Sequence, residues 1–285
     1  MSLWGSPLRF RSLQIKNRIL RASRSQPAAV EAQWRSLDWE LEYARAGVGA
    51  ILSARAEVRA PASLAPDALT IHGDEAIARW QQHVGRVHAY RCRYLIRLGL
   101  GQVARRLDQD DLRDIVRAFA EAGRRARETG ADGVEIDGAE GSLIAQLLAP
   151  GVANDRPPAF QGSLEHRARL GRQIARGVRH QVGSDFHVQF RLGVTSPLGM
   201  MAAGVPHLLG WLEHDGIDAV HVNANAVAGR YLKETAKVPV VRGGRFESEA
   251  AAHAALEDGS CDAVALVRPL EFPPREVVAP WRPAA

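Results

Sequence analysis

Two carboxylates follow a short apolar run in the stretch DGVEIDGAEGSLIAQLLAPG, residues 132–151. Asp137 and Glu140 lie three residues apart, at the end of a strand expected over 133–139. Paired carboxylates can share acid and base roles, because burial and like-charge repulsion raise the pKa of one above that of the other. The stretch is therefore the first candidate in this chain for acid–base chemistry.

Charged and amide side chains alternate with apolar ones in the neighbouring expected strands as well. If the apolar residues face surrounding helices, the polar residues face a shared interior. The polar set consists of Arg97, Glu135, Asp137, Gln189, Arg191, His221 and Asn223. We expect Asp137 and Glu140 to be the acid/base pair. Three further catalytic candidates would stabilise an enolate or a carboxylate, namely Arg97, Arg191 and His221.

An alternative interpretation is that these buried charges only compensate one another. At about 4 Å and an effective dielectric constant of about 20, two opposite charges attract by about 4 kcal/mol. Desolvation can consume that gain, so a buried ion pair is weak evidence for stability. In this alternative, Arg97, Asp137, Glu140 and Arg191 form a closed network that plugs the interior.

Short apolar runs alternate with amphipathic stretches along the whole chain. The expected helices are one capped by Asp108 and ending at Gly130, one over 163–182 and one over 248–258. Eight strands alternating with helices predict an α/β fold, a single (β/α)8 TIM barrel over residues 1–285. A doubly wound open sheet is the weaker alternative, because no GxGxxG motif opens a first helix. The expected strands are 18–23, 47–54, 94–100, 133–139, 187–193, 219–225, 238–244 and 263–269.

Composition and charge exclude several classes of function. The net charge of +5 comes from arginines that are scattered among acidic residues, without the basic run that nucleic-acid binding would favour. Cys92 and Cys261 form no CxxC motif, so neither a disulfide framework nor a metal site is expected. No apolar run is long enough for a membrane span. We expect a cytoplasmic protein with a small-molecule substrate, with no nucleic acid, membrane or metal partner, and with homo-oligomerisation left open.

Six stretches spread over almost the whole chain carry a family resemblance. They are SPLRFRSLQIKNRILRAS, YARAGVGAIL, DGVEIDGAEGSL, NDRPPAFQGSLEHRARL, DFHVQFRL and GSCDAVALVRPL. In this order they resemble the old yellow enzyme (NADH:flavin oxidoreductase) family of FMN-dependent (β/α)8 barrels. The resemblance implies the same barrel fold.

The resemblance also implies positions for an FMN cofactor. Gly243, Gly244 and Arg268 match the positions where the family holds the FMN phosphate, and Arg191 matches the cation that lies against the flavin ring. Backbone N–H groups and a guanidinium suit a phosphate, which needs several convergent donors. Because glycine pairs also end barrel strands for geometric reasons, a vestigial site is the alternative.

The substrate end departs from the family pattern. Arg97 stands where the family has a glutamine that binds the flavin, and Asp137 and Glu140 replace the pair that grips the substrate carbonyl. Ser142 replaces the proton-donating tyrosine. An ionised carboxylate only accepts hydrogen bonds and would repel an enolate oxygen, and a serine is a poor acid. We further expect Arg97 to reach toward Asp137 or Glu140 and fill the space of the flavin ring.

Three functional hypotheses follow from these departures. The preferred one is a repurposed non-redox acid/base enzyme of specialised metabolism, such as an isomerase, cyclase, dehydratase or lyase, with no cofactor favoured. The second is an FMN-dependent NAD(P)H oxidoreductase with an altered proton donor, in which FMN is the cofactor. The third is a non-catalytic partner of an active paralogue.

Overall fold

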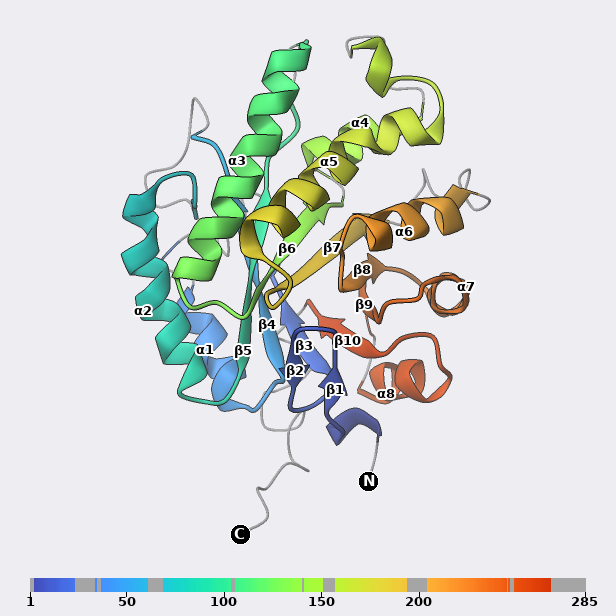
Figure 1. The fold of residues 1–285 in the computed structure, drawn as a ribbon. Helices are drawn as coiled ribbons and strands as arrows, with labels where there is room; N and C mark the ends of the chain where they lie inside the picture. Colours follow the sequence, from blue (N-terminus) through green and yellow to red (C-terminus); the bar gives the residue numbers. More distant parts are fainter. Residues whose placement is uncertain are drawn as a thin grey trace.

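The structure, a computed structural model, describes residues 3–23, 34, 37–60, 69–103, 106–139, 141–150, 157–193, 204–244, 246 and 249–267. Within these residues, eight parallel strands form a closed barrel with helices around it (Figure 1). The predicted (β/α)8 TIM barrel is therefore confirmed. In chain order the barrel strands are β3 (Ile19–Ala22), β4 (Ala50–Glu57), β5 (Arg93–Gly99), β6 (Gly133–Gly138), β7 (His187–Gly193), β8 (Ala219–Asn223), β9 (Val240–Gly244) and β10 (Ala263–Leu266).

The described helices cover the outside of the barrel. Three short 3-10 helices accompany them, η1 (Leu3–Gly5), η4 (Asp74–Ala76) and η5 (Pro158–Phe160). The α-helices are α1 (Leu37–Arg45), α2 (Ile77–His88), α3 (Gln109–Glu128), α4 (Leu143–Leu148), α5 (Leu164–Val182), α6 (Val205–His214), α7 (Ala226–Thr235) and α8 (Glu249–Glu257).

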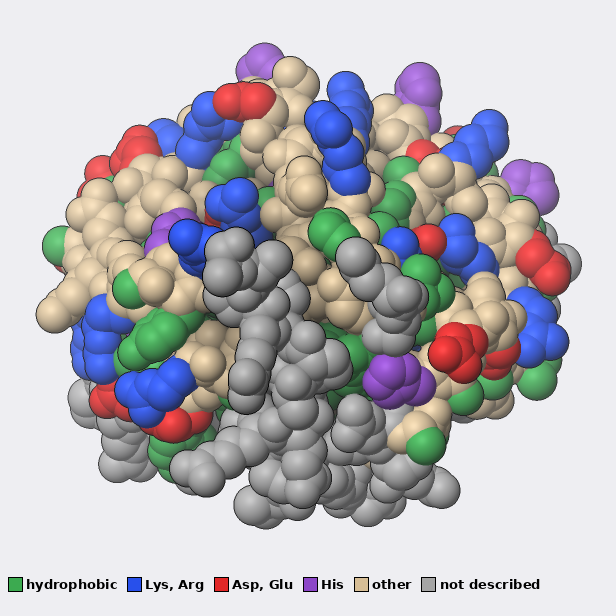
Figure 2. Space-filling view, turned by 90° about the horizontal axis from the view of Figure 1, so that it is seen from below, with side chains coloured by type: hydrophobic (Ala, Val, Ile, Leu, Met, Phe, Trp, Pro, Cys, Tyr) green, Lys and Arg blue, Asp and Glu red, His purple; other side chains and the backbone are tan. Residues whose placement is uncertain are grey.

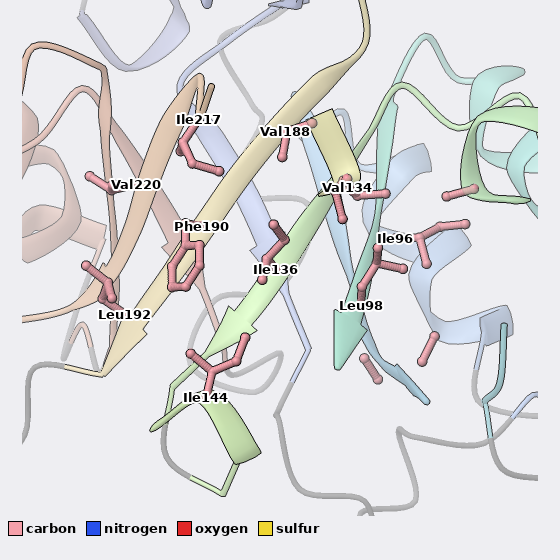
Figure 3. Close-up of a cluster of buried hydrophobic side chains, with 14 of the residues drawn as sticks. Ile96, Leu98, Val134, Ile136, Ile144, Val188, Phe190, Leu192, Ile217 and Val220 are labelled. Atoms are coloured by element: carbon pink, nitrogen blue, oxygen red, sulfur yellow. The ribbon is translucent and has the colours of Figure 1, made fainter. Parts of the chain in front are cut away.

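Apolar residues of the barrel strands alternate between two cores, as their sequence pattern predicts. Ile96, Ile136, Phe190 and Val220 face outward and pack against the helices (Figure 3). Their neighbours along each strand face the barrel axis, because successive side chains of a strand point to opposite sides. The polar residues of β5 to β8 are therefore directed into the barrel.

A hairpin that the sequence pattern did not predict closes the N-terminal end of the barrel. Strands β1 (Leu8–Arg9) and β2 (Gln14–Ile15) pair in antiparallel fashion. The ring of Phe10, between them, lies 4.8 Å from the ring of His187, the first residue of β7. The apolar residues of the hairpin join the inner core of the barrel. Apart from His187, the N-terminal end of the interior is thus mainly apolar, and most polar side chains lie toward the C-terminal ends of the strands.

Surface arginines are interspersed with carboxylates rather than gathered in one patch on the face shown in Figure 2. Helix α3 illustrates the pattern, with ion pairs between Arg113 and Asp110 at 2.5 Å and between Arg117 and Asp114 at 2.7 Å. Exposed pairs of this kind contribute only about 0–1 kcal/mol each. Among the described helices, none combines the length and the apolar character needed to cross a membrane.

Helix α3 begins with the cap that the sequence predicts. The Asp108 side chain accepts a hydrogen bond from the Asp111 backbone N–H at 2.8 Å, and the Asp111 side chain accepts one from the Asp108 backbone N–H at 3.1 Å. We expect Asp108→Ala to lower the free energy of unfolding by about 1 kcal/mol, because the backbone N–H of Asp111 loses its side-chain acceptor. Urea unfolding measures this change. Asp114→Ala, in the middle of the same helix, should change the free energy by less than about 0.5 kcal/mol, and an equal effect of the two variants would contradict the capping role.

Candidate active site

The register of the central strands arranges the inward polar residues in two rows across the barrel. Arg97, Glu135 and Gln189 are aligned on β5, β6 and β7. One step closer to the C-terminal ends, Asp137, Arg191 and His221 are aligned on β6, β7 and β8. All six side chains are buried. The structure therefore brings together four of the five predicted catalytic residues, whereas Glu140 lies outside the described residues.

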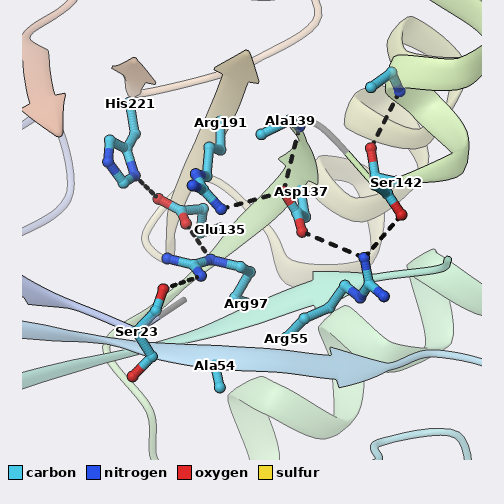
Figure 4. A network of polar contacts seen from close by, with 12 residues as sticks. Ser23, Ala54, Arg55, Arg97, Glu135, Asp137, Ala139, Ser142, Arg191 and His221 are labelled. Carbon is cyan, nitrogen blue, oxygen red and sulfur yellow. Dashed lines mark hydrogen bonds and ion pairs between the residues drawn. The ribbon is translucent and has the colours of Figure 1, made fainter. Parts of the chain in front are cut away.

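Glu135 is the centre of the first row (Figure 4). Its carboxylate accepts hydrogen bonds from Arg97 Nε at 2.6 Å and from Gln189 Nε2 at 2.5 Å. The same carboxylate lies 2.7 Å from His221 Nδ1. Four side chains from four consecutive strands are thus connected through one carboxylate.

Arg97 differs from its predicted arrangement. We expected its guanidinium to reach toward Asp137 or Glu140 at the mouth of the barrel. Instead, it pairs with Glu135 and donates from Nη1 to the Ser23 carbonyl oxygen at 2.7 Å. The reason is the register, which aligns Arg97 with Glu135 on the adjacent strand. Within the described residues, Arg97 and Asp137 therefore pair with different partners, and Glu140, a further member of the network in the alternative interpretation, lies outside them.

The electrostatics of the first row define its protonation. Burial raises the pKa of Glu135, but the charges of Arg97 and Arg191 and the hydrogen bond from His221 outweigh it and hold that pKa well below its usual range. Burial, together with the positive charges of Arg191 and Arg97, lowers the pKa of His221 despite the opposing effect of Glu135. Glu135 is therefore ionised and His221 neutral near pH 7. Because Nδ1 donates to Glu135, Nε2 is a hydrogen-bond acceptor.

Asp137 is the centre of the second cluster. Its carboxylate lies 3.6 Å from Arg191 Nη1 on one side and 4.0 Å from Arg55 Nη1 on the other. The backbone N–H of Ala139 donates to it at 3.3 Å. Two guanidinium groups thus bracket the carboxylate, so that it does not present an uncompensated negative charge to a ligand.

Arg55 and Glu57 are site residues that the sequence pattern did not predict. The expected strand over 47–54 continues to Glu57, and its pairing with β5 shifts between Leu52 and Arg55. Such a β-bulge redirects the side chains that follow it. Arg55 and Glu57 therefore face the barrel interior and pair with each other at 2.9 Å. The alternation of alanine with charged residues over 54–57 was the available signal.

Ser142 has a structural contact that bears on its predicted role. It stands before α4, and its Oγ accepts a hydrogen bond from the Ala145 backbone N–H at 3.1 Å. The side chain is fully buried. The position that the resemblance gives to a proton-donating tyrosine therefore holds the N-cap of a short helix.

The predicted cofactor end lies where β8 and β9 finish. A Cβ atom on Gly243 would lie 2.4 Å from His221 Nε2 and 2.6 Å from Asn223 Oδ1, so only a glycine fits there. Neither of these two polar atoms has a hydrogen-bond partner within the described part of the chain. Gly244 has a φ of 124°, a conformation that favours glycine. Arg268 lies outside the described residues.

These features match the chemistry of FMN. Two buried acceptors call for hydroxyl donors, which the ribityl chain carries, and glycine backbone at a strand end suits a phosphate. Arg191 supplies a cation at the C-terminal ends of the strands for the flavin ring. The residues present thus fit the cofactor. Among the described residues, no group of three or more His, Cys, Asp or Glu side chains is arranged to hold a metal ion.

The fold and the site define an α/β-barrel protein with a polar, cofactor-compatible centre at the C-terminal ends of its strands. A sequence model of the NADH:flavin oxidoreductase / NADH oxidase family matches residues 5–102 and 99–274. The chain belongs to this family. The predicted resemblance is thereby confirmed.

Curated relatives are similar over most of this chain but are longer. The NADH oxidase of Thermoanaerobacter brockii is 25% identical over 92% of this chain and 48% of its own length. The cinnamate reductase of Clostridium sporogenes is 25% identical over 93% of this chain and 50% of its own length. The chain thus spans about half the length of these curated relatives.

Solved structures share the fold. The old yellow enzyme homologue from Zymomonas mobilis superposes with a TM-score of 0.81 at 22% identity, covering 96% of this chain and 90% of that one. Morphinone reductase in complex with tetrahydroNAD gives a TM-score of 0.77 at 23% identity, with coverages of 94% and 87%. At these sequence identities, the structural similarity shows that the chain shares the barrel fold.

The family assignment corrects the preferred functional hypothesis. Non-redox isomerase, cyclase, dehydratase or lyase chemistry is wrong, because the matching family and the relatives are oxidoreductases. The expectation that no cofactor is favoured is also wrong, because the family is FMN-binding. The error came from interpreting Asp137 and Glu140 as a new acid/base pair, and Ser142 as a lost proton donor, without knowledge of the side chains and backbone groups that they contact. Asp137 is compensated by two arginines and Ser142 caps a helix.

Proposed function

We propose that this chain is an FMN-dependent NAD(P)H oxidoreductase acting on a small molecule, with a proton donor other than the family's tyrosine. The observation that carries the proposal is the pair of unpartnered acceptors, His221 Nε2 and Asn223 Oδ1, beside Gly243. Membership of the oxidoreductase family supports it. We also propose that residues 1–285 act as one TIM-barrel domain.

Bound FMN supplies hydride transfer between a nicotinamide and a second substrate. The residues of the chain hold and polarise the site. Arg191, which lies 3.6 Å from Asp137, would supply a positive charge that stabilises the reduced form of a bound flavin. Glu135 orients His221 so that Nε2 faces the cofactor position. Ser142, as an alkyl alcohol engaged in a helix cap, leaves the proton to another group.

The absorption spectrum of the purified protein tests the proposal. We expect the yellow colour of oxidised flavin, directly or after incubation with FMN, and bleaching of that colour by NADH or NADPH without oxygen. Riboflavin, which lacks the phosphate, should bind at least about tenfold more weakly, because charge-assisted hydrogen bonds to the phosphate are lost. A protein that stays colourless with added FMN would contradict the proposal and favour a non-catalytic homologue.

A further inference from the structure

One arginine at the mouth of the barrel is not used by the proposed flavin site. Arg55 starts on β4, and its side chain extends toward Asp137 of β6 (Figure 4). A Cβ on Gly99 would lie 2.3 Å from Arg55 Cδ and 3.3 Å from Asp137 Cβ. The absence of a side chain at Gly99 is therefore what lets the arginine cross the strand.

Three contacts hold the Arg55 guanidinium in one orientation. Its Nε donates to Glu57 Oε1 at 2.9 Å, and its Nη1 donates to the Gly141 carbonyl oxygen at 3.1 Å. The same Nη1 lies 4.0 Å from Asp137 Oδ2. The side chain is only 1% exposed. Because so many contacts converge on it, the guanidinium is preorganised and loses little conformational freedom on binding a ligand.

The remaining nitrogen, Nη2, is buried and has no hydrogen-bond partner within the described residues. It is directed toward Gly101, where a Cβ would lie 3.5 Å away. A buried donor without a partner costs about 1–3 kcal/mol, and more when it is charged. A ligand oxygen at this position would remove that cost.

The charges around Arg55 favour an anionic ligand. Arg55 and Arg191 are both cations, and Asp137 lies between them. Glu57 is the second carboxylate of the cluster, and burial raises its pKa despite the attraction of Arg55. Within the described residues the two cations are thus balanced by two carboxylates, and the unpartnered Nη2 of Arg55 is the donor that remains for an anionic oxygen.

We propose that Arg55 Nη2 binds a carboxylate of the substrate, so that the chain acts on carboxylic acids. This inference rests on the proposed oxidoreductase function and specifies its substrate class. A carboxylate is favoured over a phosphate because a single guanidinium nitrogen is open here. A phosphate needs several convergent donors. Asp137, at 4.0 Å from Nη1, would also repel a dianion more strongly than a monoanion.

Calorimetric titration of the purified protein with trans-2-hexenoate and with its methyl ester tests the proposal. The wild type should bind the acid at least about tenfold more tightly than the ester, as expected for one charge-assisted hydrogen bond. Arg55→Gln should abolish this preference and change the affinity for the ester less than twofold or so. Arg113→Gln makes the same chemical change at an exposed site and should keep the preference.

Gly101→Ala provides a second variant in case Arg55→Gln does not fold. The new methyl group would stand 3.5 Å from Nη2, where the ligand oxygen is placed, without touching the other contacts of the guanidinium. It should weaken binding of the acid at least about tenfold, because the anion is displaced from its donor. Circular dichroism confirms that each variant is folded.

Equal binding of acid and ester by the wild type, or an unchanged preference in folded Arg55→Gln, would overturn the proposal. An unchanged preference in Gly101→Ala would overturn it as well. Displacement of hexenoate by inorganic phosphate at equal concentration would exclude a carboxylate-specific site. Flavin absorbance, recorded for every sample, separates the two proposals. A yellow protein without acid preference refutes only the carboxylate site, whereas a colourless protein with an Arg55-dependent preference refutes only the flavin function.

Discussion

Glu135→Leu is expected to lower the free energy of unfolding by about 3–5 kcal/mol, because removing one partner of a buried ion pair leaves the other charge uncompensated. Arg97 loses a 2.6 Å ion pair, and Gln189 and His221 lose the acceptor of their hydrogen bonds. Glu135 and Arg97 are both fully buried, so water cannot replace the lost partner without entering the barrel. Urea unfolding followed by circular dichroism measures the change.

The double variant Arg97→Met/Glu135→Leu tests whether the loss arises from the uncompensated charge. It should be less destabilised than the sum of the two single variants, by about 1–3 kcal/mol, because an apolar pair leaves no buried charge. Additive effects would show that Arg97 and Glu135 act independently, contrary to the structure.

The pH dependence of stability gives an independent measurement of the same cluster. The pKa of Glu135 is lowered in the folded protein, because His221 and Arg97 outweigh the effect of burial. Its contribution is therefore fully present above the pKa of an unfolded glutamate, about 4.3, and is lost as the pH falls toward the lower folded value. The difference in unfolding free energy between wild type and Glu135→Leu should shrink below about pH 4. A difference that grows with acidity would contradict this assignment.

Gly243→Ala is expected to destabilise the protein by about 1–3 kcal/mol through overpacking, and to weaken FMN binding at least about tenfold. The added Cβ would lie 2.4 Å from His221 Nε2 and 2.6 Å from Asn223 Oδ1. His221 cannot move away easily, because its other nitrogen is held by Glu135 at 2.7 Å. The two acceptors assigned to the ribityl chain are therefore displaced together. Thermal unfolding and fluorescence titration with FMN measure the two effects.

A matched glycine substitution separates steric overlap from a general effect of alanine. A Cβ on Gly85, in the exposed face of α2, meets no atom within 4 Å. Gly85→Ala should raise the free energy of unfolding by up to about 1 kcal/mol, because alanine favours a helix, and it should leave FMN binding unchanged. If Gly243→Ala binds FMN as tightly as Gly85→Ala does, the cofactor position beside Gly243 is wrong.

Local pattern alone was sufficient for the barrel and for the inward orientation of its polar side chains. The strand over 187–193 was predicted with the bounds that the structure has, and Arg97, Asp137, Arg191 and His221 face the interior as expected. The cap of α3 at Asp108 was likewise predictable. These features depend on residues two to four positions apart, so short-range periodicity and capping chemistry determine them.

The partners of the inward charges were decided by contacts between strands. Arg97 was expected to reach Asp137, but the register aligns it with Glu135, and Asp137 is bracketed by Arg191 and Arg55. Residue types alone predicted that Asp137 and Glu140 form a catalytic acid/base pair, whereas the structure shows Asp137 compensated by two arginines. The mistaken non-redox hypothesis followed from this difference.

By itself, the sequence determined the fold class, the family and which strand residues face the barrel axis. Only the tertiary structure decided which charges pair, that Arg55 enters the site, and that Ser142 caps a helix. The physical reason is how far apart in the sequence the residues that determine each feature lie. Side-chain alternation is a property of one strand, whereas an ion pair depends on the register between strands. The bulge after Leu52 and the space above Gly99, which together admit Arg55, arise only when β4, β5 and β6 lie side by side.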